Sequence, residues 1–206
     1  MLRAAVALAD DGGIESLSMR KLADTLGVVP MALYKHVANK EELLDGMIDG
    51  VIAEIDPPIR GASWKTTVRQ RILAARQALL RHPWASRILE SRPNPTPAQL
   101  DYLNSMIGLF RAGGFSIGLA HHVAHTMGSR LFGFTQALFD DSGSVDPEAL
   151  EQMAPTYPYL VEMATAASHD DGSVVGGGCD DQYEFEFALD LLLDGFERLK
   201  QRQSRK

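Results

Sequence analysis

The sequence contains little cysteine and no long hydrophobic run, and each absence excludes a class of protein. The single cysteine, Cys179, cannot close an internal disulfide, which favours a reducing compartment. No apolar run approaches the roughly 20 residues that a bilayer-spanning helix needs. The first residues, Met1 to Asp11, form too short an apolar stretch with too acidic an end for a secretory signal. We therefore expect a soluble, cytoplasmic protein with no membrane partner.

The patterns on which catalysis and cofactor binding usually rest are also missing. The sequence has no glycine-rich phosphate loop and no nucleophile elbow, and the acidic surroundings of Cys179 disfavour its reactive thiolate. His121 and His125 are one helical turn apart and close to His122, but no carboxylate or cysteine accompanies them at ligand spacing. We expect no catalytic residue, no metal and no cofactor, although the histidines leave metal binding as the weaker alternative.

Positive charge is scarce except in one short segment. The chain of 206 residues has a net charge of -7, which argues against a protein that coats nucleic acid, because such binding depends on neutralising many phosphates. Residues 18–40 differ, because their only carboxylate is Asp24 and they carry the cations Arg20, Lys21, Lys35 and Lys40. This segment is where a local footprint for a polyanion is expected.

Helix punctuation is abundant, and no stretch alternates apolar and polar residues as a half-buried strand would. The predicted fold class is therefore all-α. Capping residues, among them Asn39 and Thr96, together with glycines and prolines, place the expected helices at 2–11, 19–26, 30–37, 40–55, 63–81, 84–89, 97–112, 117–139, 147–167 and 182–202.

A double proline, Pro57 and Pro58, marks the expected domain boundary. It divides the chain into a domain over 1–56 and a second helical domain over 57–206. Helical spacing places Leu26, Leu100 and Leu103 among the residues expected to face the core, and residues 169–181 are expected to form a solvated loop.

The first domain has the pattern of a helix-turn-helix. Ser18 is placed to cap one helix, Gly27 ends it, and Pro30 suits the first position of the next helix because it has no amide to lose there. Two such helices packed on a leading helix let the second enter a DNA major groove. The structural alternative is a small helical domain that happens to contain two helices joined by a glycine turn.

Two strings, SMRKLADTLGVVPMALYKHV at 18–37 and NKEELL at 39–44, resemble the DNA-binding domain of the TetR family of bacterial transcriptional repressors, in particular the tetracycline repressor branch. The resemblance extends from Leu2 to about Asp56 and is only architectural beyond that. It implies a three-helix DNA-binding domain followed by a helical ligand-binding and dimerisation domain. The implied function is a homodimeric repressor that binds a palindromic operator and is released by a small-molecule effector.

The resemblance also implies DNA-binding roles for individual residues. Ser18 and the amides at its helix N-terminus would hold a phosphate, as helix N-termini do, while Tyr34 and Lys40 would grip the backbone at the other end. Lys35 can donate to guanine, and Met31 can contact a thymine methyl group. The full expected set is Ser18, Arg20, Pro30, Met31, Ala32, Tyr34, Lys35, His36 and Lys40. A solvated surface role for His36 and a partly buried role for Tyr34 stay open.

In the second domain the resemblance implies that the eighth and last helices pair with their twins in a homodimer. The seam Ala120, Ala124, Met127, Leu131, Phe134 and Leu138 fits this role, and monomer core is the alternative. An adaptable apolar pocket is expected among the fifth to ninth helices. Its candidate lining residues are Trp64, Met106, Phe110, His125, Phe132, Met153 and Tyr157.

One departure from the family pattern concerns the start of the chain. Met1 stands almost inside the first helix, where family members usually carry a basic arm, so either translation begins upstream or the arm is short and some phosphate contacts are lost. The rival function is accordingly a small-molecule carrier or sensor with a vestigial DNA-binding head. An enzyme built on the helical domain is a third and weaker alternative.

Overall fold

The computed structural model describes residues 1–92, 94–133, 147–166 and 181–203. Within these ranges the chain is helical and forms no strand, which confirms the predicted fold class. The chain divides into two compact units, one of Met1–Thr135 with Phe196–Lys206, the other of Gln136–Gly195. Within the described ranges no helix is both long enough and apolar enough to span a membrane.

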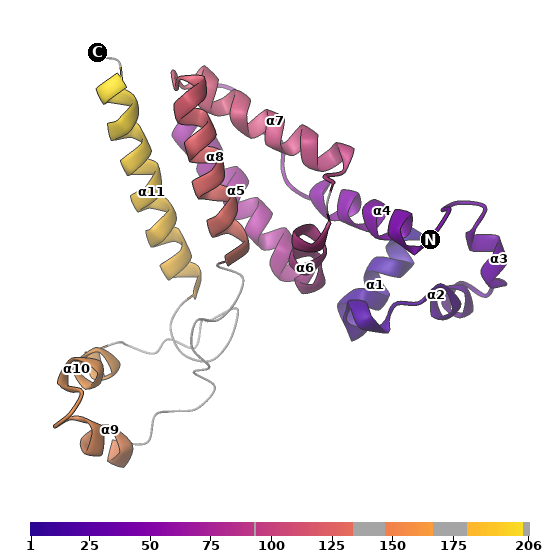
Figure 1. The fold of residues 1–206 in the computed structure, drawn as a ribbon, viewed down its shortest axis with the longest axis horizontal. Helices are drawn as coiled ribbons and strands as arrows, with labels where there is room; N and C mark the ends of the chain where they lie inside the picture. The colour runs from indigo at the N-terminus through magenta and orange to yellow at the C-terminus, as the bar shows by residue number, and fades with distance from the viewer. Residues whose placement is uncertain (93, 134–146, 167–180, 204–206) are drawn as a thin grey trace. The chain divides into compact units, whose positions relative to one another are not determined.

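The first unit begins with α1 (Leu2–Gly12), a 3-10 turn (Ile14–Ser16), α2 (Met19–Leu26), α3 (Pro30–Leu33) and α4 (Lys40–Ile52) (Figure 1). The predicted caps are confirmed. The side chain of Ser18 accepts from the amide of Lys21 at 3.1 Å, and that of Asn39 from the amide of Glu42 at 2.8 Å. Gly27 has a φ of 66°, the left-handed conformation that lets the chain leave α2 in a tight turn.

Two helices are shorter than predicted. α3 has only 4 residues, because the amides of Lys35 and His36 bond to carbonyls three residues back and so tighten the chain into turns. α4 ends at Ile52 rather than at Ile55, since the chain tightens in the same way ahead of the double proline. Leu26, expected in the core, is 37% exposed because α2 ends there.

The first unit continues with α5 (Trp64–Arg81), α6 (Pro83–Ser91), α7 (Pro97–Ala112), α8 (Ile117–Gly133) and the end of α11 (Asp181–Gln203). Thr96 and Gln99 form a reciprocal capping box at the start of α7. Leu100 and Leu103, expected to be buried, are about half exposed. Leu103 shares a helix face with the buried pair Met106 and Phe110, so its exposure reflects incomplete cover of that face rather than an outward orientation.

One hydrophobic core joins the segment from α1 to α4, called the head below, to α5 and α6. It contains buried residues of α1, α2 and α4, and also Ala78, Leu79, Trp84, Ala85 and Ile88. The linker at 57–62 therefore does not separate two cores, because α6 and the end of α5 pack back against the head.

The second unit contains α9 (Pro147–Met153), α10 (Pro158–Ala166) and the beginning of α11. The helix expected over 147–167, with interruptions at Pro155 and Pro158, is thus two helices. Pro155 and Pro158 lack the amide that a continuous helix needs, and the amides of Thr156 and Tyr157 turn back to the carbonyl of Met153. The expected loop at 169–181 and the expected extension of the eighth helix to 139 lie outside the described residues.

Candidate nucleic-acid interface and ligand cavity

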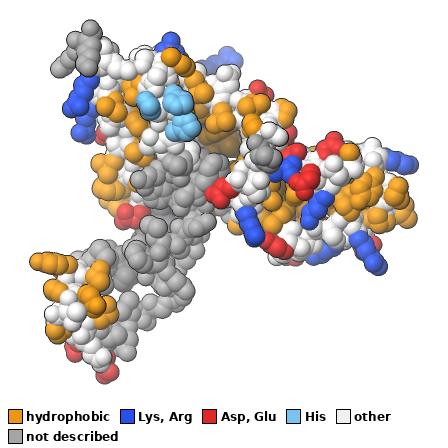
Figure 2. All heavy atoms as spheres, in the orientation of Figure 1, with side chains coloured by type: hydrophobic (Ala, Val, Ile, Leu, Met, Phe, Trp, Pro, Cys, Tyr) orange, Lys and Arg blue, Asp and Glu red, His pale blue; other side chains and the backbone are white. Residues whose placement is uncertain are grey.

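The outer surface of the head carries an exposed apolar patch over α2 and α3 (Figure 2). Met31 is 71% exposed and Val29 is 68% exposed, whereas Leu33 and Val37 of the same segment are buried in the core. Lys and Arg side chains stand around the patch. The sequence pattern singled out Met31 but not Val29, whose position before Pro30 gives no periodic signal. An exposed apolar group beside cations suits contact with thymine methyl groups next to phosphates.

The residues expected to bind DNA lie at the surface of the head, with Ala32 half-buried. Ser18 and Arg20 lie at the beginning of α2, and Pro30, Met31, Tyr34, Lys35 and His36 lie on α3 and the turn after it. Tyr34 is among the exposed large side chains rather than a core residue. Their roles in DNA binding stay predictions.

Lys40 lies beside the beginning of α2. Its ammonium nitrogen donates to the carbonyl oxygen of Leu17 at 2.8 Å, and Leu17 directly precedes the capping residue Ser18. The family resemblance implied that Lys40 and Ser18 hold opposite ends of the interface, whereas here the ammonium group is next to the helix N-terminus. A helix N-terminus and an ammonium group together make a stronger anion site than either alone.

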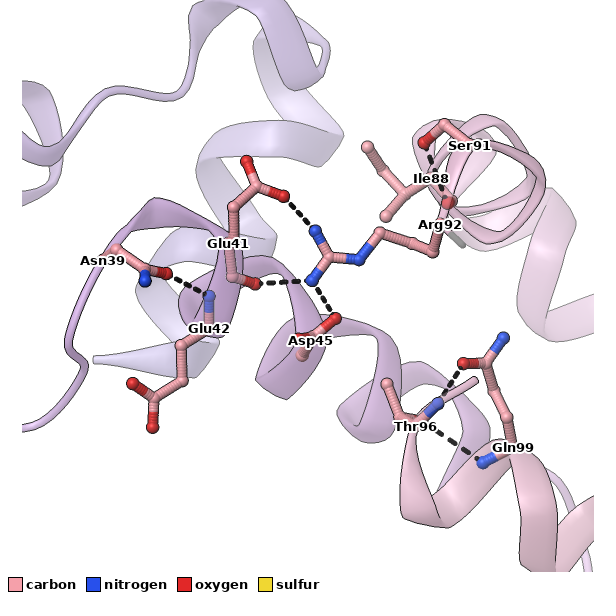
Figure 3. A network of polar contacts seen from close by, with 9 residues as sticks. All are labelled: Asn39, Glu41, Glu42, Asp45, Ile88, Ser91, Arg92, Thr96 and Gln99. Carbon is pink, nitrogen blue, oxygen red and sulfur yellow. Dashed lines mark hydrogen bonds and ion pairs between the residues drawn. The ribbon is translucent and has the colours of Figure 1, made fainter. Parts of the chain in front are cut away.

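A largely buried guanidinium group contacts the beginning of α4 (Figure 3). The guanidinium group of Arg92, just after α6, pairs with the carboxylates of Glu41 and Asp45 and donates to the carbonyl oxygen of Glu41 at 2.9 Å. The hydrogen bond to Asp45 and the attraction of both carboxylates raise the pKa of Arg92. This cation offsets the negative charge next to Lys40. Sequence reasoning missed Arg92, because its partners are 47 and 51 residues away along the chain.

A second polar junction ties α1 and the end of α4 to the turn between α5 and α6. The buried His82 has Nδ1 2.8 Å from an Asp10 carboxylate oxygen and Nε2 3.0 Å from one of Glu54. The indole of Trp84 donates to the same Asp10 oxygen at 2.7 Å. Arg81 pairs with Glu54 at 2.6 Å, and its hydrogen bond, with that of His82, lowers the Glu54 pKa.

A cavity of about 220 Å³ lies among α4, α5, α7 and α8. Among its lining residues only Gln99 and Tyr102 carry polar side chains. The others are apolar or glycine: Ile48, Val51, Ile52, Ile55, Ile72, Ala75, Ala78, Leu79, Leu89, Leu103, Met106, Ile107, Phe110, Ala124, Met127 and Gly128. The helix that begins at the candidate DNA-binding surface therefore forms one wall of the cavity.

Only part of the expected pocket set lines this cavity. Met106 and Phe110 do so. Trp64 instead makes a tilted ring contact with Phe110 and an edge-on contact with Phe115, and its indole donates to Glu197 at 3.0 Å. Both types of position are apolar at helical spacing, so the sequence could not tell them apart. Met153 and Tyr157 belong to the second compact unit and are exposed there, and the side chain of Phe132 lies outside the described residues.

His125 is at the surface of α8 together with His121 and His122, and the three form the pale blue patch in Figure 2. The rings of His121 and His125 are 4.6 Å apart between centroids. In the described part of the chain no group of three or more His, Cys, Asp and Glu side chains could hold a metal ion. The three histidines thus form an exposed cluster on α8 with two ring contacts, one between His121 and His122 and one between His121 and His125.

Comparison with known proteins agrees with this arrangement. Residues 1–47 match the family described as bacterial regulatory proteins, tetR family, and residues 57–199 match the tetracyclin repressor-like C-terminal domain. The tetracycline repressor protein class D of Escherichia coli is 32% identical over 208 residues, which cover 96% of this chain and 87% of that protein.

Two further relatives are an HTH-type transcriptional regulator of Saccharopolyspora erythraea and a solved structure from Streptomyces coelicolor. The regulator is 37% identical over 116 residues, 56% of this chain and 49% of that protein, so the match spans about half its length. The structure is the TetR family protein ActR in complex with (S)-DNPA, with a TM-score of 0.68, 25% identity, and coverage of 95% of this chain and 94% of that one.

Proposed function

Since the chain belongs to the TetR family of ligand-responsive, DNA-binding transcription regulators, which are not enzymes, we propose that it acts as a homodimeric repressor. Two copies bind a palindromic operator, and a small molecule in the cavity beside α4 releases them. The proposed domains are a DNA-binding domain over 1–56 and a ligand-binding and dimerisation domain over 57–206, in the cytoplasm.

The surface of the head supports the DNA-binding step. Lys40 and the N-terminus of α2 would hold one phosphate, with Tyr34 as a further backbone contact. Met31 and Lys35 stand exposed where base edges would be read. The exposed set proposed to contact DNA is Ser18, Arg20, Pro30, Met31, Tyr34, Lys35, His36 and Lys40, with half-buried Ala32 at its edge.

The release step is supported by one observation: α4 contributes residues both to the candidate DNA-binding surface and to the lining of the cavity. Its first residue is Lys40, and Ile48, Val51 and Ile52 near its other end line the cavity. A helix of this length carries displacement at one end to the other, because its backbone hydrogen bonds keep it stiff. A molecule that fits the cavity only when α4 shifts would lower the population of the DNA-competent arrangement.

Exposed apolar side chains support the proposed dimer. On α11, Tyr183, Phe187 and Leu191 recur at intervals of four and are all exposed, as is Ile117 at the beginning of α8. An exposed apolar stripe on a long helix is typical of a helix that pairs with a partner. We propose that α8 and α11 pair with their twins about a two-fold axis, which makes the interface isologous.

The test uses the full chain and the DNA upstream of its own gene. Footprinting should show protection of a palindrome, and sedimentation should show two protomers per operator. Spacing changes of half a helical turn between the half-sites should abolish tight binding, because the heads could no longer meet successive major grooves. A protein that retains small molecules but protects no DNA would be a carrier with a vestigial head instead.

A further inference from the structure

One of the residues that line the apolar cavity carries a buried polar atom without a partner. The hydroxyl oxygen of Tyr102, on α7, is fully buried and has no hydrogen-bond partner among the described residues. Tyr102 is also one of the residues that line the cavity. A buried hydroxyl that makes no hydrogen bond costs free energy that a bound partner would recover.

The surroundings of Tyr102 keep this hydroxyl in its neutral form. Burial raises the pKa of Tyr102 to about 12, and the nearby Arg71 opposes this shift only in part. The guanidinium carbon of Arg71 lies over the Tyr102 ring, 4.9 Å from its centroid, and its Nη1 donates to the carbonyl oxygen of Asp56 at 2.9 Å. Arg71 therefore contacts the face of the Tyr102 ring. The hydroxyl stays protonated and can donate a hydrogen bond.

The rest of the lining excludes charge. None of the lining residues is Asp, Glu, Lys, Arg or His, so an ionised ligand would lose its hydration without gaining a counter-charge. The capping box holds the side chain of Gln99, whose oxygen accepts from the amide of Thr96 at 2.6 Å, so only its NH2 group is left as a second donor, and Tyr102→Phe separates the two donors. The same lining offers no ligand set for a metal chelate.

The size of the cavity limits the ligand further. Its volume of about 220 Å³ is below the roughly 300–1,000 Å³ of pockets that hold drug-sized molecules. A compact ring system fits this description, whereas a large polycyclic molecule requires the walls to move apart.

We propose that this cavity takes a compact, neutral, mainly apolar molecule with one carbonyl-type oxygen, which accepts a hydrogen bond from the Tyr102 hydroxyl. The inference rests on the proposed function, because it assigns the chemical class of the effector that would enter the cavity beside α4. It selects against anionic ligands and metal chelates.

The experiment compares two naphthalenes of nearly equal shape, 2-acetylnaphthalene and 2-ethylnaphthalene, which differ in the carbonyl oxygen. Binding to the full chain is measured by calorimetry or by quenching of tryptophan fluorescence. The ketone should bind about tenfold more tightly, the effect of one buried hydrogen bond. In Tyr102→Phe the preference should disappear, while the affinity for 2-ethylnaphthalene stays the same.

Tyr159→Phe is the matched control, because Tyr159 is 82% exposed and lies in the second compact unit. It should keep the tenfold preference. The proposal is overturned if Tyr102→Phe keeps the preference, if neither naphthalene binds, or if 2-naphthoate binds as tightly as the ketone. Tyr102→Phe should unfold at the same temperature as the parent or higher, since it removes an unpaired hydroxyl.

The outcome is separable from that of the proposed function. If the chain protects a palindrome but shows no preference for the ketone, only the class of effector is wrong. If it shows the preference but binds no operator, the cavity chemistry stands and the repressor function fails.

Discussion

The ammonium nitrogen of Lys40 lies 2.8 Å from the carbonyl oxygen of Leu17, which places the first residue of α4 against the chain just before α2. One side chain thus joins the beginning of α4 to the residue before the α2 cap. The contact leaves two of the ammonium hydrogens for other acceptors.

For Lys40→Gln we expect an affinity for all DNA sequences that is about tenfold lower, together with a salt dependence whose slope falls by about 1, because one phosphate contact is lost. Fluorescence anisotropy titrations at several salt concentrations measure both quantities. Arg60→Gln, which removes an exposed cation from the linker after α4, serves as the control for net charge. An unchanged salt slope in Lys40→Gln would show that the ammonium group does not contact a phosphate.

The exposed Met31 predicts sensitivity to thymine methyl groups. Replacing individual thymines of the operator by uracil removes only the methyl group, so affinity should fall about threefold to tenfold at the contacted positions, as one lost apolar contact implies. Met31→Ala should bind more weakly and lose this sensitivity. Equal binding of thymine and uracil operators by the parent protein at every position would rule out methyl recognition by the apolar patch.

Arg92 predicts a link between head stability and DNA binding. In Arg92→Gln the carboxylates of Glu41 and Asp45 lose their partner beside Lys40, so operator affinity should fall and the protein should be less stable by about 1 kcal/mol, a modest value because both carboxylates are partly exposed. Urea unfolding measures the stability term. The double variant Arg92→Gln with Asp45→Asn should recover part of both losses, and strict additivity would contradict the coupling.

Glu54 predicts an acid-sensitive contribution to stability. Its pKa in the folded state is lowered below 4.5, so its contribution is present above that pH and is lost as the pH falls through the folded value. The difference in unfolding free energy between the parent and Glu54→Gln should therefore be largest near neutral pH and shrink below about pH 4.5. Urea titrations from pH 7 to pH 3 test this, with Glu90→Gln, an exposed position on α6, as the control. A difference that grows in acid would contradict the sign.

The sequence predicted local features of this chain well and distant contacts poorly. Ser18, Asn39 and Thr96 were predictable helix caps, because a cap is a bond between residues three apart. The pairing of Arg92 with Asp45 joins residues 47 apart, and that of His82 with Asp10 joins residues 72 apart. No periodic pattern encodes such contacts, since they exist only once the helices have packed.

The cavity shows a second limit of prediction from sequence, which concerns apolar residues. Phe110 and Trp64 follow the same helical spacing, yet the first lines the cavity and the second packs beside Phe115. Periodicity identifies which face of a helix is buried but not which buried side chain borders empty space. Tyr102 was missed for a related reason, because a tyrosine on a half-exposed helix gives no sign that its hydroxyl is unpaired.

The shared core of α1, α4 and α6 limits how the head can be exchanged. A chimera that grafts residues 1–56 onto another regulator would leave Trp84, Ile88 and His82 behind. The core residues of α1 and α4 would then lose apolar neighbours, and Asp10 and Glu54 would lose the imidazole that they share. Transplanting the DNA specificity of this chain therefore requires a segment that extends through α6, or the transfer of only the surface residues of α2 and α3.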